Sequence, residues 1–309
     1  MKSRILVIGS SNIDFVCRMP RFPEIGECLI SKDTYAFVPG GKGANSALAA
    51  ARLGGDVVFC SRVGNDSYGN QLVDKYEKEG IDTRFVIKDK TARTGLVVMM
   101  AEETGHKRVV AYPGASSNLC LNDLEGAFTT YPDALLMQLE IGAPLVIAAT
   151  EMAQEKGIKV ILDAGLAKAD FPLESLGKLE IFSPNETETQ ILTGIYPNSS
   201  DNCLRACVNL MNRVNANYIV LKLGERGCYI YDGIHCTHVA PVEAGTVVDT
   251  TAAGDSFTAA LTYRYCENGG DIQDACKFAN AVGAYVVTKQ GAFSSIPTMK
   301  ELNQFLANK

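Results

Sequence analysis

Short apolar runs alternate with segments of helical periodicity along most of the chain, and this alternation limits the possible folds. The runs expected to form strands are residues 5–8, 57–62, 134–139, 159–162, 179–182, 218–222 and 227–231. Helices are expected to begin near Gly43, Tyr68, Pro144, Thr187, Cys203, Gly254, Asp271 and Met299. Because strands that alternate with helices pair in parallel, we expect an α/β fold with a central, mostly parallel sheet and helices on both faces. In such sheets ligands collect at the carboxyl ends of the strands.

Two segments interrupt the alternation. Residues 27–38 and 94–112 are rich in β-branched side chains and have no helix between their extended stretches, and the second has a turn-like centre at 102–106. We expect one domain over residues 1–309, with a small β lid formed by about residues 15–39 and 94–113. Such a flap would cover a site and exclude water, or would form a dimer surface, because an exposed sheet edge needs a partner.

Composition excludes several classes of protein. A chain of 309 residues with 47% hydrophobic and 21% charged residues is typical of a soluble globular protein. The formal net charge of -6 disfavours a nucleic-acid partner, since there is no basic excess to neutralise phosphates. No run approaches the roughly 18–20 apolar residues of a membrane span. Ten scattered cysteines without a C-x-x-C pair suit reduced thiols, so we expect a cytoplasmic protein.

The most informative motif is Asp249-Thr250-Thr251-Ala252-Ala253-Gly254-Asp255, which leads into a predicted helix. Small side chains let an anion approach the backbone, and the free N–H groups of a helix N-terminus attract it. An aspartate at such a site is costly unless it has a task, such as taking a proton from a hydroxyl that attacks phosphorus. The alternative is an ordinary helix start with an acidic first turn.

A second motif is Gly40-Gly41-Lys42-Gly43-Ala44-Asn45, which also precedes a predicted helix. Its glycines allow close approach of the backbone to a ligand. It matches neither the Walker P-loop nor the G-x-G-x-x-G dinucleotide fingerprint, so a dehydrogenase is disfavoured. A purely structural turn is the alternative.

Polar side chains follow several of the predicted strands. Asn12 and Asp14 can face one direction from an extended loop, and such a pair suits the hydroxyl groups of a polyol. Glu140 follows another strand. Asn185 and Glu188 are spaced either to cap a helix or to organise a hydrated Mg2+, and the two roles are compatible. Residues 223–227 form either a plain hairpin or a loop against a nucleotide.

Together these residues resemble the ribokinase family, the PfkB-type carbohydrate kinases. Residues 40–45 are similar to the first signature of the family, and residues 249–255 with the following helix are similar to the second. The order and spacing match over essentially the whole chain. The resemblance implies a ribokinase-like fold and an ATP-dependent sugar kinase that phosphorylates the primary 5-hydroxyl of D-ribose.

The resemblance also implies a role for each matching residue. Asp255 would be the general base, and the N–H groups of Ala252, Ala253 and Gly254 would form the anion hole. The sugar would be held by Asn12, Asp14, Gly41, Lys42, Asn45 and Glu140. The nucleotide would meet Asn185, Lys222, Gly224, Gly227 and Asn280, with Glu188 reaching Mg2+ through water. An activating monovalent cation, K+ in the family, would lie at Asp249, Thr251, Val286, Lys289, Gly291 and Ser295.

Some positions depart from the family pattern. Lys222 stands where a threonine is expected, and Lys289 where many relatives carry arginine. Ser116 and Ser117 interrupt the Gly-Ala-Asn sequence expected after the flap strands, which puts substrate contacts from that side in question.

The alternatives concern the acceptor and the activity. The same chemistry could serve another small sugar or a nucleoside, such as deoxyribose, fructose or adenosine. A catalytically silent sugar-binding regulator is a remote alternative, which the presence of Asp255, Gly254 and Asn185 disfavours. The expected partners are a sugar and ATP, with no nucleic acid or membrane, and the chain is expected to form a homodimer through the β lid.

Overall fold

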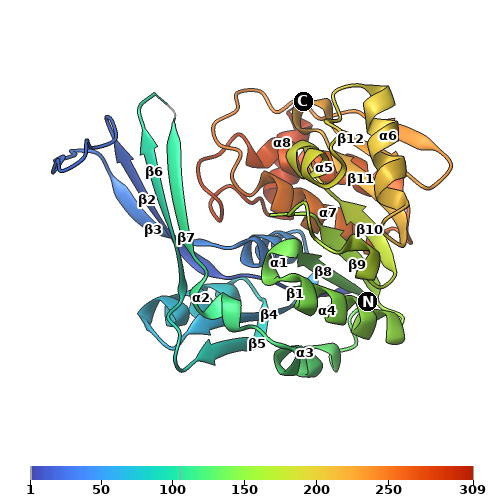
Figure 1. The fold of residues 1–309 in the computed structure, drawn as a ribbon, viewed down its shortest axis with the longest axis horizontal. Helices are drawn as coiled ribbons and strands as arrows, with labels where there is room; N and C mark the ends of the chain where they lie inside the picture. The colour runs from blue at the N-terminus through green and yellow to red at the C-terminus, as the bar shows by residue number, and fades with distance from the viewer. Residues whose placement is uncertain (1, 105, 309) are drawn as a thin grey trace.

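The computed structural model describes residues 2–104 and 106–308, and its core is a large sheet (Figure 1). Within these residues the sheet has nine strands in the order β13-β12-β11-β10-β9-β8-β1-β4-β5. The strands are β1 (Arg4–Ile8), β4 (Asp56–Gly64), β5 (Asp82–Asp89), β8 (Ala134–Gln138), β9 (Lys159–Asp163), β10 (Leu179–Ser183), β11 (Ala216–Lys222), β12 (Cys228–Tyr231) and β13 (Cys236–Val239). From β5 to β11 neighbouring strands are parallel, and β12 and β13 continue as antiparallel strands.

Helices cover both faces of the large sheet. One face packs against α1 (Lys42–Arg52), α2 (Ser67–Lys78), α7 (Ala253–Glu267), α8 (Ile272–Val286) and α9 (Met299–Ala307). The other packs against α3 (Leu121–Phe128), α4 (Ala143–Glu155), α5 (Glu186–Thr193) and α6 (Ser200–Met211). Strand β1 shows why the fold forms: Ile5 and Val7 enter the first core, whereas Leu6 and Ile8 enter the second. A strand with two buried faces must be apolar throughout.

The common direction of the parallel strands places ligands at the carboxyl edge of this sheet. Strand β1 lies between β4 and β8, and later strands are added on the β8 side. Strands of an α/β sheet that leave in opposite directions from a central strand open a crevice at their carboxyl ends. The loops that follow β1, β8, β9, β10 and β11 all emerge at this edge.

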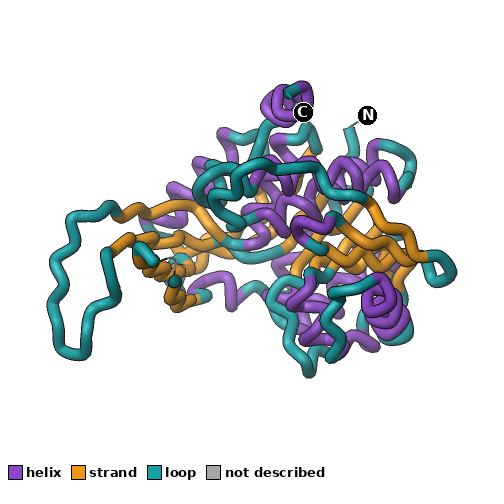
Figure 2. Tube along the Cα trace, turned by 90° about the horizontal axis from the view of Figure 1, so that it is seen from above, coloured by secondary structure: helices purple, strands orange, loops and turns teal. Residues whose placement is uncertain are grey.

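A small second sheet stands beside this edge, in the order β3-β2-β6-β7 (Figure 1). Its strands are β2 (Asn12–Met19), β3 (Tyr35–Gly40), β6 (Gly95–Glu102) and β7 (Lys107–Tyr112). Strand β2 pairs with β3 in antiparallel fashion and with β6 in parallel. Figure 2 shows the connection between β2 and β3 as a long loop that projects beyond the strands.

The predicted fold class is confirmed, and each predicted strand and helix start lies within a few residues of an element. The missed elements include strand β5 and helix α3. The prediction of a strand at 27–38 was wrong for residues 27–33, which have no strand partner, and β3 begins only at Tyr35. Asn12 and Asp14 begin strand β2 and are not in an extended loop, because β3 and β6 supply hydrogen-bond partners from distant segments. The turn predicted at 102–106 includes Gly105, which lies outside the described residues.

No helix within residues 2–104 and 106–308 has the length and apolar character needed to cross a membrane.

Candidate active site

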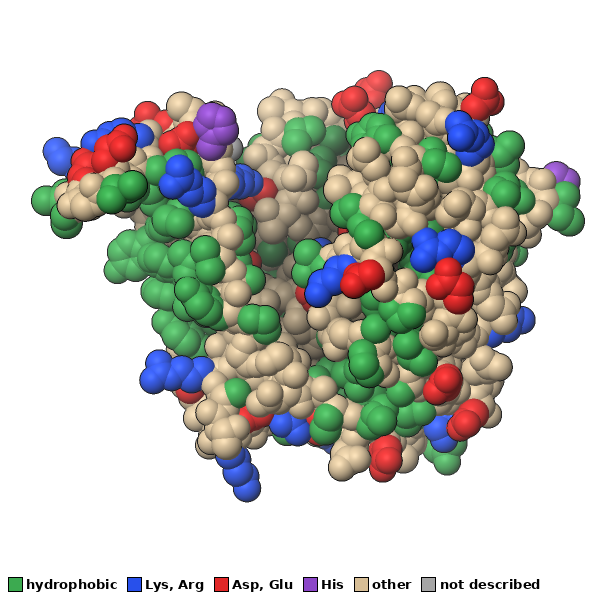
Figure 3. Space-filling model, in the orientation of Figure 1, with side chains coloured by type: hydrophobic (Ala, Val, Ile, Leu, Met, Phe, Trp, Pro, Cys, Tyr) green, Lys and Arg blue, Asp and Glu red, His purple; other side chains and the backbone are tan. Residues whose placement is uncertain are grey.

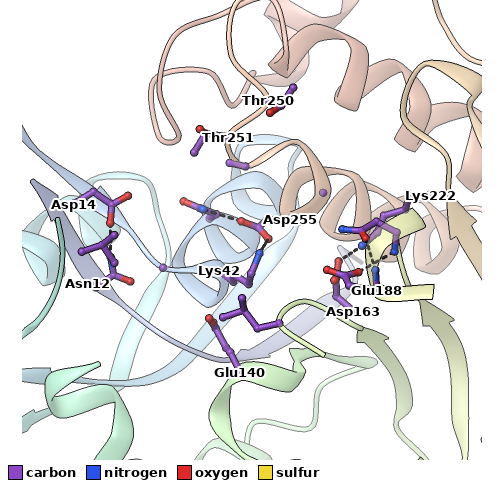
Figure 4. Close-up of a pocket in the computed structure, with 17 residues that line it drawn as sticks. Asn12, Asp14, Lys42, Glu140, Asp163, Glu188, Lys222, Thr250, Thr251 and Asp255 are labelled. Carbon is purple, nitrogen blue, oxygen red and sulfur yellow. Dashed lines mark hydrogen bonds and ion pairs between the residues drawn. The ribbon is translucent and has the colours of Figure 1, made fainter. Parts of the chain in front are cut away.

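A cavity of about 420 Å³ lies at the carboxyl edge of the large sheet, between it and the small sheet (Figures 3 and 4). Its lining residues come from both sheets and from the N-termini of three helices, α1, α5 and α7. They are Asn12, Asp14, Gly41, Lys42, Asn45, Val97, Glu140, Asp163, Leu166, Asn185, Glu188, Lys222, Thr250, Thr251, Ala252, Gly254 and Asp255. Most of the residues named from the sequence therefore meet in one cavity, although they are spread over some 240 positions of the chain.

Asp255 lies in the first turn of α7 and is 5% exposed. One carboxylate oxygen accepts a hydrogen bond from Asn45 Nδ2 at 2.8 Å, and the other lies 3.3 Å from Lys42 Nζ. Both donors belong to the first turn of α1. The neighbouring carboxylates, Asp255 first among them, raise the pKa of Lys42, so this lysine stays charged. A buried carboxylate held by an amide and an ammonium is positioned to accept a proton.

Helix α7 begins with an uncommon backbone conformation. Ala252 has φ 63°, in the left-handed region, which costs a residue with a Cβ about 1–2 kcal/mol. The Ala253 amide donates to the Thr250 carbonyl oxygen at 3.2 Å. In the part of the chain that the structure describes, the amides of Ala252 and Gly254 have no such acceptor, and both residues line the cavity, whereas Ala253 does not. These free amides at a helix N-terminus can bind an anion.

The sequence did not single out Asp163, which ends β9 beside Lys222. The Lys222 ammonium lies 2.5 Å from one Asp163 carboxylate oxygen, and both side chains are almost fully buried. The same oxygen accepts a hydrogen bond from Thr258, one turn into α7. An aspartate directly after a buried strand was the available signal, but its pairing with Lys222 depends on tertiary structure.

Asn185 and Glu188 form a reciprocal cap at the start of α5. The Glu188 amide donates to Asn185 Oδ1, and the Asn185 amide donates to Glu188 Oε2, both at 2.8 Å. The capping role is therefore present. Burial raises the pKa of Glu188, against the lowering effect of nearby Lys222. Among the described residues, Glu188 Oε1 has no hydrogen-bond partner, so the side chain retains an oxygen that suits a hydrated Mg2+.

The wall formed by β2 carries Asn12 and Asp14, whose side chains face the same way (Figure 4). Asn12 Nδ2 donates to Asp14 Oδ1 at 2.5 Å. Burial raises the pKa of Asp14 to about 6, although this hydrogen bond lowers it in part. Nearby, Asn45 Oδ1 is buried and has no partner among the described residues. A buried orphan acceptor that borders a cavity suits a ligand hydroxyl group.

Glu140 closes the opposite side of the cavity. Its Oε1 accepts a hydrogen bond from Ser10 Oγ at 2.5 Å, in the loop that follows β1. Burial raises the pKa of Glu140, and the Ser10 bond and the charge of Lys42 offset part of that rise.

Asp249 joins two loops just outside the cavity. One carboxylate oxygen accepts from the amide and hydroxyl of Thr251, and the other accepts from the Gly291 amide and from Gln290 Nε2. Burial alone would raise the pKa of Asp249, but the bonds from Thr251 and Gly291 outweigh burial and lower it. Val286, the last residue of α8, and Ser295, in the segment that follows this helix, are both buried. The Lys289 amide donates to the Val286 carbonyl oxygen.

Three residues expected near the nucleotide lie outside the cavity. Gly224 and Gly227 flank the short turn between β11 and β12, so residues 223–227 connect the strands of a hairpin, and contact of this turn with a nucleotide stays a prediction. Asn280 is buried in α8, and its side-chain amide donates to the Ala240 carbonyl oxygen at 2.9 Å. Ser116 bonds to the backbone of Ser11 and Arg62 and does not line the cavity. A role of Gly224, Gly227 and Asn280 toward a nucleotide stays a prediction.

A buried aspartate beside free helix N-terminal amides, with two lysines, at the carboxyl edge of an α/β sheet, is the arrangement of a phosphotransferase. Residues 2–299 match the model of the pfkB family carbohydrate kinases. The chain therefore belongs to the pfkB family of carbohydrate kinases.

Relatives and solved structures agree with this assignment. The chain is 33% identical over 308 residues to the ribokinase of Haemophilus influenzae, and the match covers 99% of each chain. It is 30% identical over 305 residues to the deoxyribokinase of Salmonella typhi, with 98% of each chain covered. The structure of Arabidopsis thaliana ribokinase complexed with ribose and ATP superposes with a TM-score of 0.89 at 29% identity, covering 99% of each chain.

Proposed function

We propose that this protein transfers the γ-phosphoryl group of ATP to the primary 5-hydroxyl of D-ribose and so produces ribose 5-phosphate. The single observation that carries the proposal is the Asp255 carboxylate, held by Lys42 and Asn45 beside the open amide of Gly254. Support for ribose comes from the relatives, since the Haemophilus influenzae protein and the Arabidopsis thaliana complex are both ribokinases.

Asp255 acts as the general base. A bond forms between the sugar oxygen and the γ-phosphorus while the bond to the β–γ bridging oxygen breaks, and the hydroxyl proton passes to Asp255. The Lys42 ammonium, 3.3 Å from one carboxylate oxygen, orients the base. The amides of Ala252 and Gly254 stabilise the charge on the transferred group. The Ala253 amide, in the same turn, would have to release the Thr250 carbonyl oxygen to join them.

The sugar occupies the part of the cavity between the small sheet and α1. Asp14 accepts two hydroxyl hydrogens, and Asn12 supplies both a donor and an acceptor. Asn45 Oδ1, which has no partner among the described residues, accepts a third hydroxyl. Gly41, Lys42 and Glu140 complete the contacts, since all three border the same space.

The nucleotide lies toward β10 and β11. Asn185 and Lys222 meet its phosphates, while Gly224, Gly227 and Asn280 lie farther along toward the base. Glu188 holds Mg2+ through water, using the oxygen that its cap leaves free. When bound, Mg2+ neutralises the phosphate charge, and the protein residues orient the reacting atoms around it.

A monovalent cation, K+ in this proposal, steadies the turn that carries the anion hole. Its ligands are Asp249, Thr251, Val286, Lys289, Gly291 and Ser295. The Asp249 carboxylate already accepts two hydrogen bonds on each oxygen, so backbone carbonyls must supply most of the ion's contacts. An ion there would balance the Asp249 charge and order residues 249–252.

The small sheet is the lid of the site and also a dimer surface. Its strand register places Asp14 and Val97 toward the cavity, and Phe37 and Val110 on the opposite face. Tyr35 and Phe37 are 70% and 47% exposed, and apolar side chains gather over this part of the molecule in Figure 3. An exposed apolar face on a sheet with free edges favours a second copy as its partner.

Deoxyribose is the second candidate acceptor, because the Salmonella typhi relative is a deoxyribokinase of similar identity. Fructose and nucleosides such as adenosine are more distant alternatives. A nucleoside would need apolar room beside the sugar, and among the lining residues Val97 and Leu166 are the large apolar side chains.

Replacing the base tests the chemistry. Asp255→Asn should lower kcat by about 100- to 10,000-fold, because the transition state loses its proton acceptor. Ribose affinity, measured by calorimetry without ATP, should stay within about threefold of the affinity of the unmodified protein. The substitution removes only the negative charge of the side chain, and the loss of one charge changes binding by a small amount. Ser256→Ala is the matched control, since Ser256 is equally buried and its Oγ has no partner among the described residues. Retention of more than a few per cent of kcat in Asp255→Asn would remove Asp255 from this role.

Ribose affinity should depend on pH through Asp14. The protonated carboxyl, which predominates below its pKa of about 6, cannot accept two hydroxyl hydrogens. The dissociation constant measured without ATP should therefore rise about tenfold per pH unit below 6 and level off above about 7. Asp14→Asn should bind weakly at every pH, whereas Glu140→Gln should keep the pH dependence. A flat profile for the unmodified protein between pH 5 and 7.5 would contradict the assignment.

A panel of acceptors tests the identity of the substrate and the activation by potassium in one experiment. ADP release is measured with ribose, 2-deoxyribose, fructose and adenosine, in potassium and in a salt of a bulky organic cation. We expect the highest kcat/KM with ribose, and a severalfold increase in potassium. Preference for deoxyribose would support the second candidate, and equal rates in both salts would argue against a cation at Asp249.

The dimer proposal predicts a concentration-dependent change in mass. Sedimentation velocity at micromolar protein should report twice the 33.2 kDa of the chain. Phe37→Ser should shift the population toward the monomer, because it places a polar group in the apolar face. Leu166→Ser, at an exposed apolar residue of the cavity, is the control and should leave the mass unchanged. A monomer at all concentrations would end the proposal.

A further inference from the structure

Two basic side chains of the small sheet lie in one row across its strands. Arg18 of β2 pairs with Ala101 of β6, and Ala101 pairs with Lys107 of β7. Arg18 follows Asp14 by four residues, and side chains two or four positions apart point to the same face of a strand. Both cations therefore lie on the face of the small sheet that borders the cavity, beyond the row that carries Asp14 and Val97.

Both cations reach the loop region around Asp249. The Arg18 guanidinium donates to Gln290 Oε1 at 2.9 Å, and Gln290 Nε2 donates in turn to Asp249 Oδ2, also at 2.9 Å. The Lys107 ammonium lies 3.9 Å from Asp249 Oδ1. The Asp249 side chain is only 8% exposed, whereas that of Lys107 is 49% exposed. A nearly buried carboxylate is thus linked, directly and through Gln290, to cations of a separate sheet.

Asp249 connects these contacts to the turn that begins α7. Its Oδ1 accepts from the amide and the hydroxyl of Thr251, at 3.1 and 2.7 Å. Thr251 lines the cavity and directly precedes Ala252, whose backbone has φ 63°. Figure 4 shows Thr251 on the loop that leads to the helix of Asp255. A shift of the Asp249 carboxylate would therefore move the turn that offers its amides to the transferred group.

The strength of these contacts matches the strain in the turn. An exposed hydrogen bond or ion pair changes an equilibrium constant by a factor of about 1.4 to 5. The left-handed conformation of Ala252 is disfavoured by a factor of about 5 to 30. Two contacts made together are therefore large enough to shift the turn between an ordered and a less ordered state.

We infer that Arg18, Lys107 and Gln290 are positioning residues that couple the sugar-binding face of the small sheet to the phosphoryl-binding turn through Asp249. The inference rests on the proposed kinase function and adds to it a connection between the two substrate sites. A sugar bound at Asp14 holds the small sheet over the cavity, and the two cations of that sheet then hold Asp249 and the turn. Because coupling is reciprocal, each substrate strengthens the binding of the other by the same factor.

The rival explanation is that these contacts only fasten the small sheet to the rest of the molecule. Their loss would then weaken sugar binding whether or not a nucleotide is present, and the turn would keep its order. If the inference holds, their loss leaves the affinity for sugar alone nearly unchanged and removes the mutual strengthening of the two substrates.

The test uses Arg18→Met, Lys107→Met and the double variant, with Arg108→Met as the matched control. All three side chains are exposed, so the variants should fold. Arg108 is the next residue of β7 and faces the other side of the sheet, where its guanidinium carbon lies 4.1 Å from the centre of the Phe22 ring. Calorimetry gives the dissociation constant of an imido-bridged, non-hydrolysable ATP analogue with Mg2+, with and without saturating ribose. The ratio of the two constants is the coupling factor.

We expect ribose to strengthen analogue binding about fivefold or more in the unmodified protein and in Arg108→Met. Each of Arg18→Met and Lys107→Met should reduce this factor about two- to threefold, and the double variant should bring it to within about twofold of one. The affinity for ribose alone should stay within about twofold of that of the unmodified protein.

Hydrogen exchange, measured by mass spectrometry, provides a readout that does not depend on activity. Ribose should slow the exchange of the amides of residues 250–256 in the unmodified protein, because the turn becomes more ordered. The same ribose concentration should leave the exchange of this segment unchanged in the double variant.

Three results would overturn the inference and leave the kinase function standing. They are a coupling factor near one in the unmodified protein, an unchanged coupling factor in the double variant, and a weaker affinity for ribose alone with the coupling factor unchanged. The last is the result expected if the contacts only fasten the small sheet. Failure of the unmodified protein to bind ribose or the analogue would overturn the proposed function together with the inference.

Discussion

The Asp255 carboxylate joins the N-termini of α1 and α7, and the rest of the site is arranged around this contact. Its oxygens meet Asn45 and Lys42, both in the first turn of α1. A buried carboxylate needs such donors, so each helix fixes the rotation of the other. The contact requires α1 to lie against the loop after β1, and a Cβ on Gly43 would come within 2.6 Å of the Gly9 backbone. Position 43 therefore needs a glycine for steric reasons, as well as for the close approach of the backbone to a ligand.

Electrostatics explains why so many carboxylates can share one cavity. Each lysine in the cavity is paired with an aspartate, and Glu140 and Asp14 hold hydrogen bonds from Ser10 and Asn12. Burial nevertheless raises the pKa of Asp14 and Glu140. Both carboxylates would therefore gain from hydroxyl donors, which a sugar supplies. The acidic surroundings also explain why phosphate binding would need cations beyond the two lysines.

The sequence predicted the main sheet well because its strands are buried on both faces and so have continuous apolar runs. Strand β5 was missed because it lies at the edge of the sheet and is only partly buried, which removes that signal. The small sheet was harder, since β2 borders the cavity and carries Asn12 and Asp14, which read as loop residues. Motif-based reasoning found most of the lining residues. It missed Asp163 because a single aspartate after a strand is common, and its partner Lys222 is 59 residues away.

By itself the sequence determined the α/β class, the edge of the sheet where ligands collect, and the two motifs that form helix N-termini there. These properties follow from local periodicity and from backbone sterics, which act over a few residues. Only the tertiary structure decided which side chains meet: Asp255 with Lys42 and Asn45, Lys222 with Asp163, and Asp249 with the loop at Gly291. Such pairings depend on how distant strand ends and helices are brought to one edge, and burial then determines which charges must be paired.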